Sequence, residues 1–97
     1  MAFEFFEGRL VYSEDGRELA EVTFPEVAEA VVDIDHTFVD DALRGRGMAS
    51  ELMERVAVKL REDGKRARLT CSYARGWFEK HAEYADVAIL REGADNG

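Results

Sequence analysis

Polar and apolar residues alternate between residues 31 and 39, which is the pattern of a strand with one buried face. Val32, Ile34, His36 and Phe38 are expected to share one face, which is the more apolar of the two. Two earlier stretches, 6–12 and 18–24, also have strand character and flank Asp15-Gly16, a dipeptide typical of tight hairpins. These three strands are expected to form an antiparallel meander.

The apolar spacing changes to that of a helix between residues 47 and 63. One apolar stripe recurs at intervals of three and four residues and comprises Ala49, Leu52, Met53, Val56, Ala57 and Leu60. Gly64 follows at a position that commonly ends a helix. A further strand over 66–71 comes next, with Cys71 on its apolar face. A strand, a helix and a strand in this order predict a parallel pair with a right-handed crossover.

The last quarter of the chain predicts a second, shorter helix. Ser72 is expected to cap it, and it should run through Trp77 to about His81. A short final strand over 84–90 and a frayed tail over 91–97 complete the expectation. The chain is thus expected to form a single α/β domain over 1–97, with its core over about 6–90.

A basic, glycine-rich turn, Leu43 to Ser50, lies between the strand 31–39 and the long helix. Gly45 and Gly47 permit left-handed backbone and close approach to a ligand, and the helix start supplies unpaired N–H groups. Arg44 and Arg46 add donors suited to phosphate. This combination predicts an anion site for a phosphate or pyrophosphate. The alternative is a solvated turn whose arginines offset an acidic protein.

Two common phosphate motifs do not match this turn. A Walker A loop needs Lys and then Ser or Thr after its last glycine, and Met48 follows here. A dinucleotide fingerprint needs a third glycine where Ser50 stands. The pattern Arg44-x-x-Gly47-x-Ala49 instead resembles the acetyl-CoA loop of the GCN5-related N-acetyltransferases.

Other segments extend this resemblance over roughly residues 8–87: His36-Thr37-x-Val39, Cys71-Ser72-Tyr73-Ala74 and His81-Ala82-Glu83-Tyr84. Together they are similar to short single-domain N-acetyltransferase-like proteins of the YjdJ type. The resemblance implies a GNAT-like mixed sheet, with acetyl-CoA as cosubstrate and Cys71 near its acetyl group. It implies a cofactor site made of Phe38, Val39, Arg44, Gly45, Arg46, Gly47, Met48, Ala49 and Tyr73.

The chain also departs from the family pattern. Phe38 stands where this type usually has Glu, and Phe78 best matches the tyrosine that protonates the departing thiolate in larger members. These departures predict slow or narrow acetyl transfer. The resemblance also implies that the chain starts at the hairpin that follows the strand and two helices of the acceptor site in larger members. The acceptor side is therefore expected to be open, or completed by a second copy or a partner protein.

Cys71 and His36 are the leading candidates for catalysis. Cys71 either accepts the acetyl group or protonates the leaving thiolate, and the alternative is a small buried hydrophobe. His36 is a candidate general base, and the alternative is a histidine that faces the core beside Ile34. Tyr73 and His81 are weaker candidates.

Composition narrows the range of partners. The net charge of −8 over 97 residues argues against nucleic acid and favours a cationic acceptor amine. No apolar run predicts a membrane span or signal peptide, and a single cysteine suits the cytoplasm. No Cys/His spacing predicts a metal site. An acyl-CoA sensing module without turnover, and a partner-docking protein, remain the alternative functions.

Overall fold

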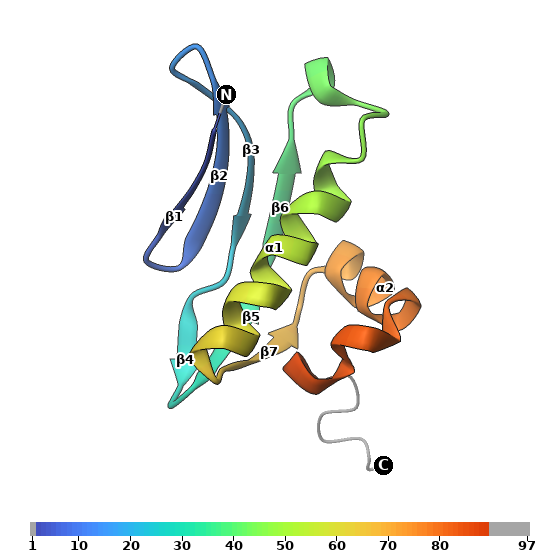
Figure 1. Cartoon of the computed structure of the whole chain (residues 1–97). Helices are drawn as coiled ribbons and strands as arrows, with labels where there is room; N and C mark the ends of the chain where they lie inside the picture. Colours follow the sequence, from blue (N-terminus) through green and yellow to red (C-terminus); the bar gives the residue numbers. More distant parts are fainter. Residues whose placement is uncertain (1, 90–97) are drawn as a thin grey trace.

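The computed structural model describes residues 2–89 and shows two four-stranded sheets with helices packed on one side (Figure 1). The first sheet has the order β1-β2-β3-β6 and the second has the order β4-β5-β7-β8. Pairing is antiparallel throughout the first sheet, whereas β5, β7 and β8 are parallel to one another. This mixed α/β architecture is the predicted one.

The N-terminal meander contains one more strand than expected. The stretch 6–12 is not one strand, because β1 (Ala2–Phe6) ends before a turn at Glu7-Gly8 and β2 (Arg9–Glu14) begins after it. The second turn is the predicted Asp15-Gly16 hairpin, in which both residues have positive φ, and it leads into β3 (Arg17–Thr23). Aromatic rings of β1 pack toward α1, where Arg55 lies 3.7 Å over the ring of Phe3.

The strand expected over 31–39 is two strands with different neighbours. β5 (Val31–Ile34) pairs with the short β4 (Glu26–Ala28) and with β7 (Arg66–Leu69), whereas β6 (His36–Val39) pairs with β3. The break falls at Asp35. The long hairpin from β3 to β6 therefore runs through both sheets and joins them.

This break also changes which residues face the core. Val32 and Ile34 are buried as predicted, but His36 and Phe38 are exposed, and Phe38 is 45% accessible. Thr37 and Val39 are half-buried instead, and Val39 packs against the core. The alternative in which His36 faces the core is therefore wrong, because an irregularity of one residue exchanges the two faces of a strand.

The long helix α1 (Met48–Asp63) forms where the periodicity places it. Its buried face consists of Met48, Leu52, Met53, Val56, Ala57 and Leu60. Ala49 is only half-buried, since the helix begins at Met48 and turns it toward the loop. Gly64 follows in left-handed conformation, and its N–H group bonds to carbonyls of the last turn. Glu51 and Arg55 form an ion pair at 2.9 Å on the exposed side of the helix.

The C-terminal part is close to the prediction, with two differences. α2 (Ser72–Lys80) is preceded by Cys71 as its N-cap residue, so Ser72 is not the cap. Residues expected to open the final strand form a short 3-10 segment, η2 (Ala82–Val87), before β8 (Ala88–Ile89). The tail predicted over 91–97, and Leu90, lie outside the described residues.

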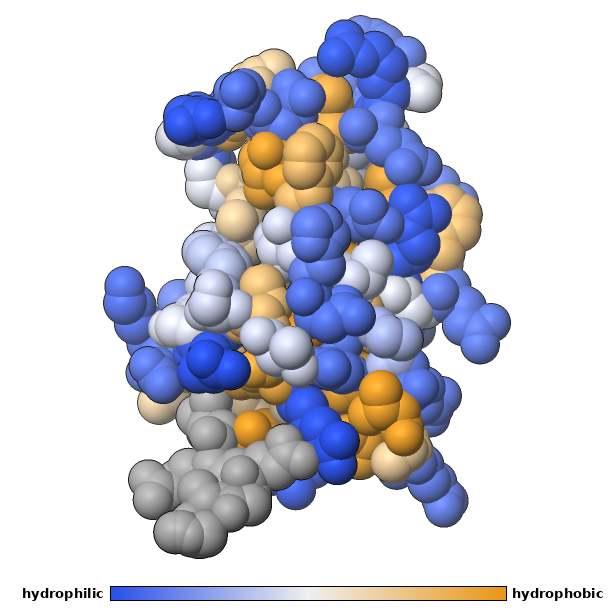
Figure 2. All heavy atoms as spheres, turned by 180° about the vertical axis from the view of Figure 1, so that it is seen from behind, coloured by the Kyte–Doolittle hydropathy of each residue, from blue (hydrophilic) through white to orange (hydrophobic). Residues whose placement is uncertain are grey.

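Both helices pack on the same side of the sheets. Their shared core includes Trp77, Phe78 and Tyr84. The opposite side, seen in Figure 2, is mostly polar with small separate apolar areas, and no helix within residues 2–89 covers it. No helix in this range has both the length and the apolar composition that a membrane span requires.

Candidate functional site

The glycine-rich turn is held in place by the residues on either side of it. Asp40 follows β6, and its side chain accepts a hydrogen bond from the N–H of Ala42 at 2.9 Å. A single 3-10 turn, η1 (Asp41–Leu43), buries Leu43 in the core. The loop beyond it is therefore anchored at a fixed distance from the strand that precedes it.

The loop ends at the start of α1 with glycine in left-handed backbone. Gly45 and Gly47 have φ values of +80° and +72°, and Gly47 occupies the N-cap position without a side-chain cap. The first helical bond runs from the N–H of Glu51 to the carbonyl of Gly47 at 3.1 Å. The N–H groups of the three residues before Glu51 therefore point out of the helix end.

A pocket of about 310 Å³ opens at this junction. It is lined by Val39, Asp40, Asp41, Leu43, Arg44, Gly45, Gly47, Met48, Ala49, Ser50 and Tyr73. Seven of these are among the nine residues predicted to hold the cofactor, and the two missing are Phe38 and Arg46. Leu43 and Ser50 were not among the predicted residues, because their place in the lining depends on how the loop folds.

The two loop arginines point to different surroundings. Arg44 lines the pocket and forms an exposed ion pair with Asp41. Arg46 is directed to the hairpin between β2 and β3, where it lies 3.7 Å from Glu14. Glu14 also accepts a hydrogen bond from the hydroxyl of Tyr12, which raises the pKa of Tyr12. Arg44 is thus the loop arginine placed at the pocket.

Cys71 lies where β7 ends, at the edge of the gap left by the strand break. Its N–H donates to the carbonyl of Ile34 at 3.0 Å, which is the last bond between β5 and β7. Its half-buried sulfur lies 3.6 Å from the hydroxyl of Thr37. Cys71 does not line the loop pocket itself, but a charge on it would act on Tyr73, which does.

His36 is not brought to the same place as Cys71. It neighbours Thr37 along β6, so its side chain is on the opposite face from the Thr37 contact, and it is exposed. Phe38 is on that opposite face as well. The two residues predicted for catalysis thus lie on different sides of β6.

Tyr73 connects the loop pocket with the second helix. It is 41% exposed, and burial of the rest of the ring raises the pKa of its hydroxyl, an effect opposed by a hydrogen bond with Ser50. Ser50 also accepts a 2.7 Å hydrogen bond from Nε1 of Trp77. An adjoining pocket of about 420 Å³ shares Ser50 and Tyr73 with the loop pocket and includes Lys80 and His81.

Two further residues singled out from the sequence, Phe78 and His81, pack against Trp77. Phe78 is 1% exposed and packs edge-on against Trp77, so it is a core residue. His81 stacks on Trp77 with ring centroids 3.9 Å apart.

A larger pocket of about 680 Å³ lies beside the other end of α1, where Lys59, Asp63 and Phe5 contribute to it. Within residues 2–89, no group of three or more His, Cys, Asp or Glu side chains is arranged to hold a metal ion.

Comparison with known proteins agrees with this architecture. Residues 8–87 match the model of the GCN5-related N-acetyl-transferase family. The curated protein NATD1 from Gallus gallus and from Homo sapiens is 36% identical over 55 residues, which is 57% of this chain. These matches span only about half of the relatives' own length, 50% and 49%.

Solved structures show the same fold. A GCN5-like protein from Staphylococcus aureus, determined by solution NMR, superposes with a TM-score of 0.78 at 29% identity, covering 98% of this chain and 94% of that one. The ribosomal-protein-S18-alanine N-acetyltransferase of Escherichia coli has a TM-score of 0.62 at 17% identity, covering 75% of this chain and 50% of that one. The latter likeness extends to the fold alone. By the match over most of its length, this chain belongs to the GCN5-related N-acetyltransferase family.

Proposed function

We propose that this protein binds acetyl-CoA and transfers the acetyl group to an amine acceptor. The observation that carries the proposal is the pocket at the start of α1, where outward N–H groups, two left-handed glycines and Arg44 lie together. A helix start of this kind favours a pyrophosphate. Membership of the family supports the same ligand, and the finer YjdJ-type assignment is part of this proposal.

The glycines leave room for such a ligand. A Cβ built on Gly45 or Gly47 would meet no protein atom within 4 Å, so the space in front of both backbones is open. Both residues line the pocket. The cosubstrate's phosphates can therefore approach the backbone closely, with Arg44 turning from its exposed ion pair toward them at little energetic cost.

The strand break supplies a further feature that acetyl transfer needs. β6 is an edge strand within residues 2–89, and Asp40 donates its N–H to Leu19 across the pair with β3. Alternation along an antiparallel strand then turns the N–H groups of Thr37 and Val39 toward the gap. Such groups suit the stabilisation of a thioester oxyanion.

Cys71 is the thiol beside this gap, and two roles fit it. In the first, its sulfur bonds to the acetyl carbon, the bond from that carbon to the CoA sulfur breaks, and the thiol proton passes to the CoA thiolate. The acceptor amine then takes the acetyl group as an amide and returns a proton to Cys71. In the second, the amine attacks acetyl-CoA directly, Cys71 donates its proton to the leaving thiolate, and the proton that the amine loses returns to Cys71.

The acceptor and the cellular setting follow from charge and composition. A net charge of −8 favours a cationic amine over an anionic one. We place the reaction in the cytoplasm, since the single cysteine is a free thiol. The uncovered side of the sheets would leave the acceptor side open, or available to a second copy or a partner protein.

One observation favours the alternative of an acyl-CoA sensor without turnover. Phe78, the match to the usual tyrosine acid, has no hydroxyl and is buried, so the usual proton donor is lacking. Tyr73 offers a hydroxyl at the pocket, and burial of part of its ring raises the pKa of that hydroxyl. A sensor would bind acetyl-CoA and release it unchanged.

Calorimetry with acetyl-CoA and with CoA, followed by intact mass spectrometry, tests the proposal. Binding with a mass increase of about 42 Da, the acetyl group expected for covalent catalysis, would support the acyl-cysteine role if Cys71→Ala abolished it. Binding and turnover without an adduct would support direct transfer. Binding with no turnover on any amine would favour the sensor, and absence of binding to either compound would refute the proposal and leave a partner-docking protein.

A further inference from the structure

The backbone changes partners within one peptide unit at the strand break. The carbonyl of Ile34 accepts the N–H of Cys71 at 3.0 Å, on the side of β7. The next N–H, that of Asp35, donates to the carbonyl of Thr23 at 3.2 Å, on the side of β3. The gap beside β6 therefore begins at the bond between Ile34 and Asp35.

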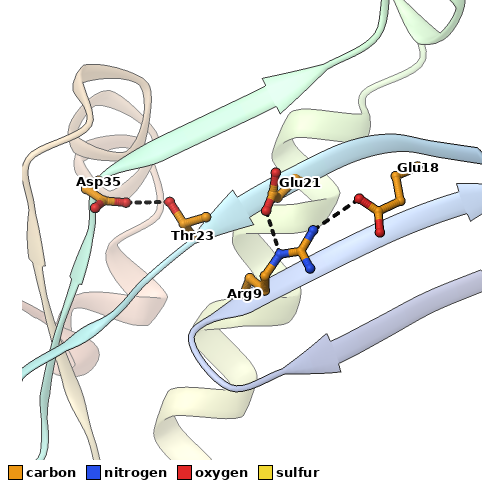
Figure 3. A network of polar contacts seen from close by, with 5 residues as sticks. All are labelled: Arg9, Glu18, Glu21, Thr23 and Asp35. Carbon is orange, nitrogen blue, oxygen red and sulfur yellow. Dashed lines mark hydrogen bonds and ion pairs between the residues drawn. The ribbon is translucent and has the colours of Figure 1, made fainter.

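A carboxylate lies on each side of this point, and each binds a threonine: Asp33 binds Thr70, which directly follows β7, and Asp35 binds Thr23 of β3. Asp33 accepts from the N–H of Thr70 at 3.2 Å and from its hydroxyl at 2.8 Å. Asp35 accepts from the hydroxyl of Thr23 at 2.5 Å, as Figure 3 shows. Each carboxylate thus adds a side-chain hydrogen bond beside the backbone hydrogen bond that joins the same two segments.

We propose that Asp33 and Asp35 are positioning residues that fix the separation between β6 and Cys71. Thr70 is the residue immediately before Cys71, so the Asp33 contact sets where the thiol lies. Thr23 pairs with His36, the neighbour of Thr37, so the Asp35 contact sets where the edge of β6 lies. Between them, the two carboxylates determine the contact of 3.6 Å between Thr37 and Cys71.

The exposure of these hydrogen bonds indicates that they position the two threonines and contribute little to the free energy of unfolding. All three bonds are exposed, and exposed charged contacts contribute little net stability. A carboxylate has only acceptor oxygens, so Asp33 can hold both donors of Thr70 at once. Neither carboxylate contacts the loop pocket, so neither is expected to bind the cosubstrate.

We call the contacts of Asp33 with Thr70 and of Asp35 with Thr23 the clamp. Figure 3 also shows how the β3 side of the clamp is supported. Arg9 of β2 binds Glu21 at 2.6 Å and Glu18 at 3.1 Å, and both glutamates belong to β3. Thr23 is on the same strand. The strand to which Asp35 is tied is therefore itself held by side chains on the uncovered face of the sheet.

Part of the test needs no ligand. The rate at which iodoacetamide modifies Cys71 reports its surroundings in the free protein. Removing the Thr70 hydroxyl in Thr70→Val, or the carboxylate in Asp33→Ala, should raise this rate at least about threefold, and the double variant should show no further increase. Thr70→Ser restores the hydroxyl and should restore the wild-type rate. Thr23→Val and Asp35→Ala form the matching double-mutant cycle for the contact with β3, and the same pattern of alkylation rates is expected there.

The consequence for catalysis rests on the proposed function and is measured separately. The same variants should lower the turnover of acetyl-CoA while leaving its binding affinity within about twofold, because the loop pocket is intact. Asp63→Ala is the matched control, since it removes an exposed ion pair with Lys59 at the far end of α1. It should change neither the rate of alkylation nor turnover.

The outcomes separate this inference from the proposed function. Unchanged alkylation rates in folded Thr70→Val and Thr23→Val would overturn the clamp, even if acetyl-CoA is turned over. A wild-type protein that binds no CoA species would refute the proposed function. The clamp would still be supported if each double variant showed no increase in alkylation rate beyond that of its single variants. Should an alanine variant fail to fold, Asp33→Asn and the exposed Thr70→Val carry the comparison.

Discussion

The sulfur of Cys71 lies 3.6 Å from the hydroxyl oxygen of Thr37, across the gap between β6 and the end of β7. The two residues are 34 positions apart, so the contact forms only when the strand break and the α1 crossover are both in place. It gives the thiol a polar neighbour on its open side. Cys71 also packs against the hydrophobic core, so its surroundings are partly polar and partly apolar.

Gly47→Val should abolish binding of acetyl-CoA and leave the fold largely intact. Valine at a φ of +72° is strained by about 1–3 kcal/mol, and its side chain would enter the pocket. Gly64→Val is the matched control, because Gly64 has a φ of +71° and similar open space at the other end of α1. Calorimetry and thermal unfolding should show similar losses of stability but a loss of affinity in Gly47→Val alone. Unchanged affinity in that variant would refute the loop assignment.

Arg44→Ala should weaken acetyl-CoA binding by about tenfold or more, whereas Arg46→Ala should weaken it by less than about threefold. The difference arises because Arg44 lines the pocket, while Arg46 is directed to Glu14. Calorimetry at two salt concentrations measures both effects, and the loss in Arg44→Ala should be smaller at high salt. Equal losses for the two variants would show that Arg46 leaves Glu14 and joins the site.

Phe78→Ala should lower the free energy of unfolding by about 3–5 kcal/mol, because the ring is fully enclosed in the core. Phe38→Ala removes the same side chain from an exposed position and should cost no more than about 0.5 kcal/mol. Urea unfolding of the two variants measures the contrast. A large loss in Phe38→Ala would mean that another surface covers this ring.

Stability should depend on the pair Asp86 and Arg61 at acid pH. Two hydrogen bonds from Arg61, at 2.6 and 2.9 Å, lower the pKa of Asp86 below its ordinary value of 3.8. The stabilising contribution is therefore present above pH 3.8 and is lost as the pH falls through the lowered pKa. Asp86→Asn should unfold at a lower temperature than wild type at pH 7, and the difference should shrink as the pH falls below 3.8.

Glu62→Gln, on the exposed side of the same helix as Arg61, is the control for the general effect of acid. Its melting temperature should follow that of the wild type at each pH. A difference between Asp86→Asn and wild type that stays constant down to pH 2 (about two units below the ordinary carboxyl value) would contradict the assignment.

Periodicity and turn chemistry were sufficient to predict α1, the Asp15-Gly16 hairpin and the parallel pairing across α1. Each depends on residues close in sequence, such as Gly64 at the helix end. Most of the loop pocket could be predicted for the same reason, since Arg44 through Ala49 form one continuous segment.

The break at Asp35 could not be predicted, because its cause is not local. The residues on both sides of it continue the same alternation, and the strand divides only because β3 and β7 compete for its two halves. For this reason the alternation puts His36 on the same face as Ile34 and does not reveal the contact between Thr37 and Cys71. The first strand was missed because Phe5 and Phe6 are consecutive and do not alternate.

The hydrogen bond from Trp77 to Ser50 has a practical consequence. Trp77 is the single tryptophan of the sequence, and its indole is attached to a residue that lines both pockets beside Tyr73. Indole emission responds to the polarity and hydrogen bonding around the ring. The protein therefore has an intrinsic optical reporter one residue away from the loop pocket, and binding of acetyl-CoA there can be tested by fluorescence without any label.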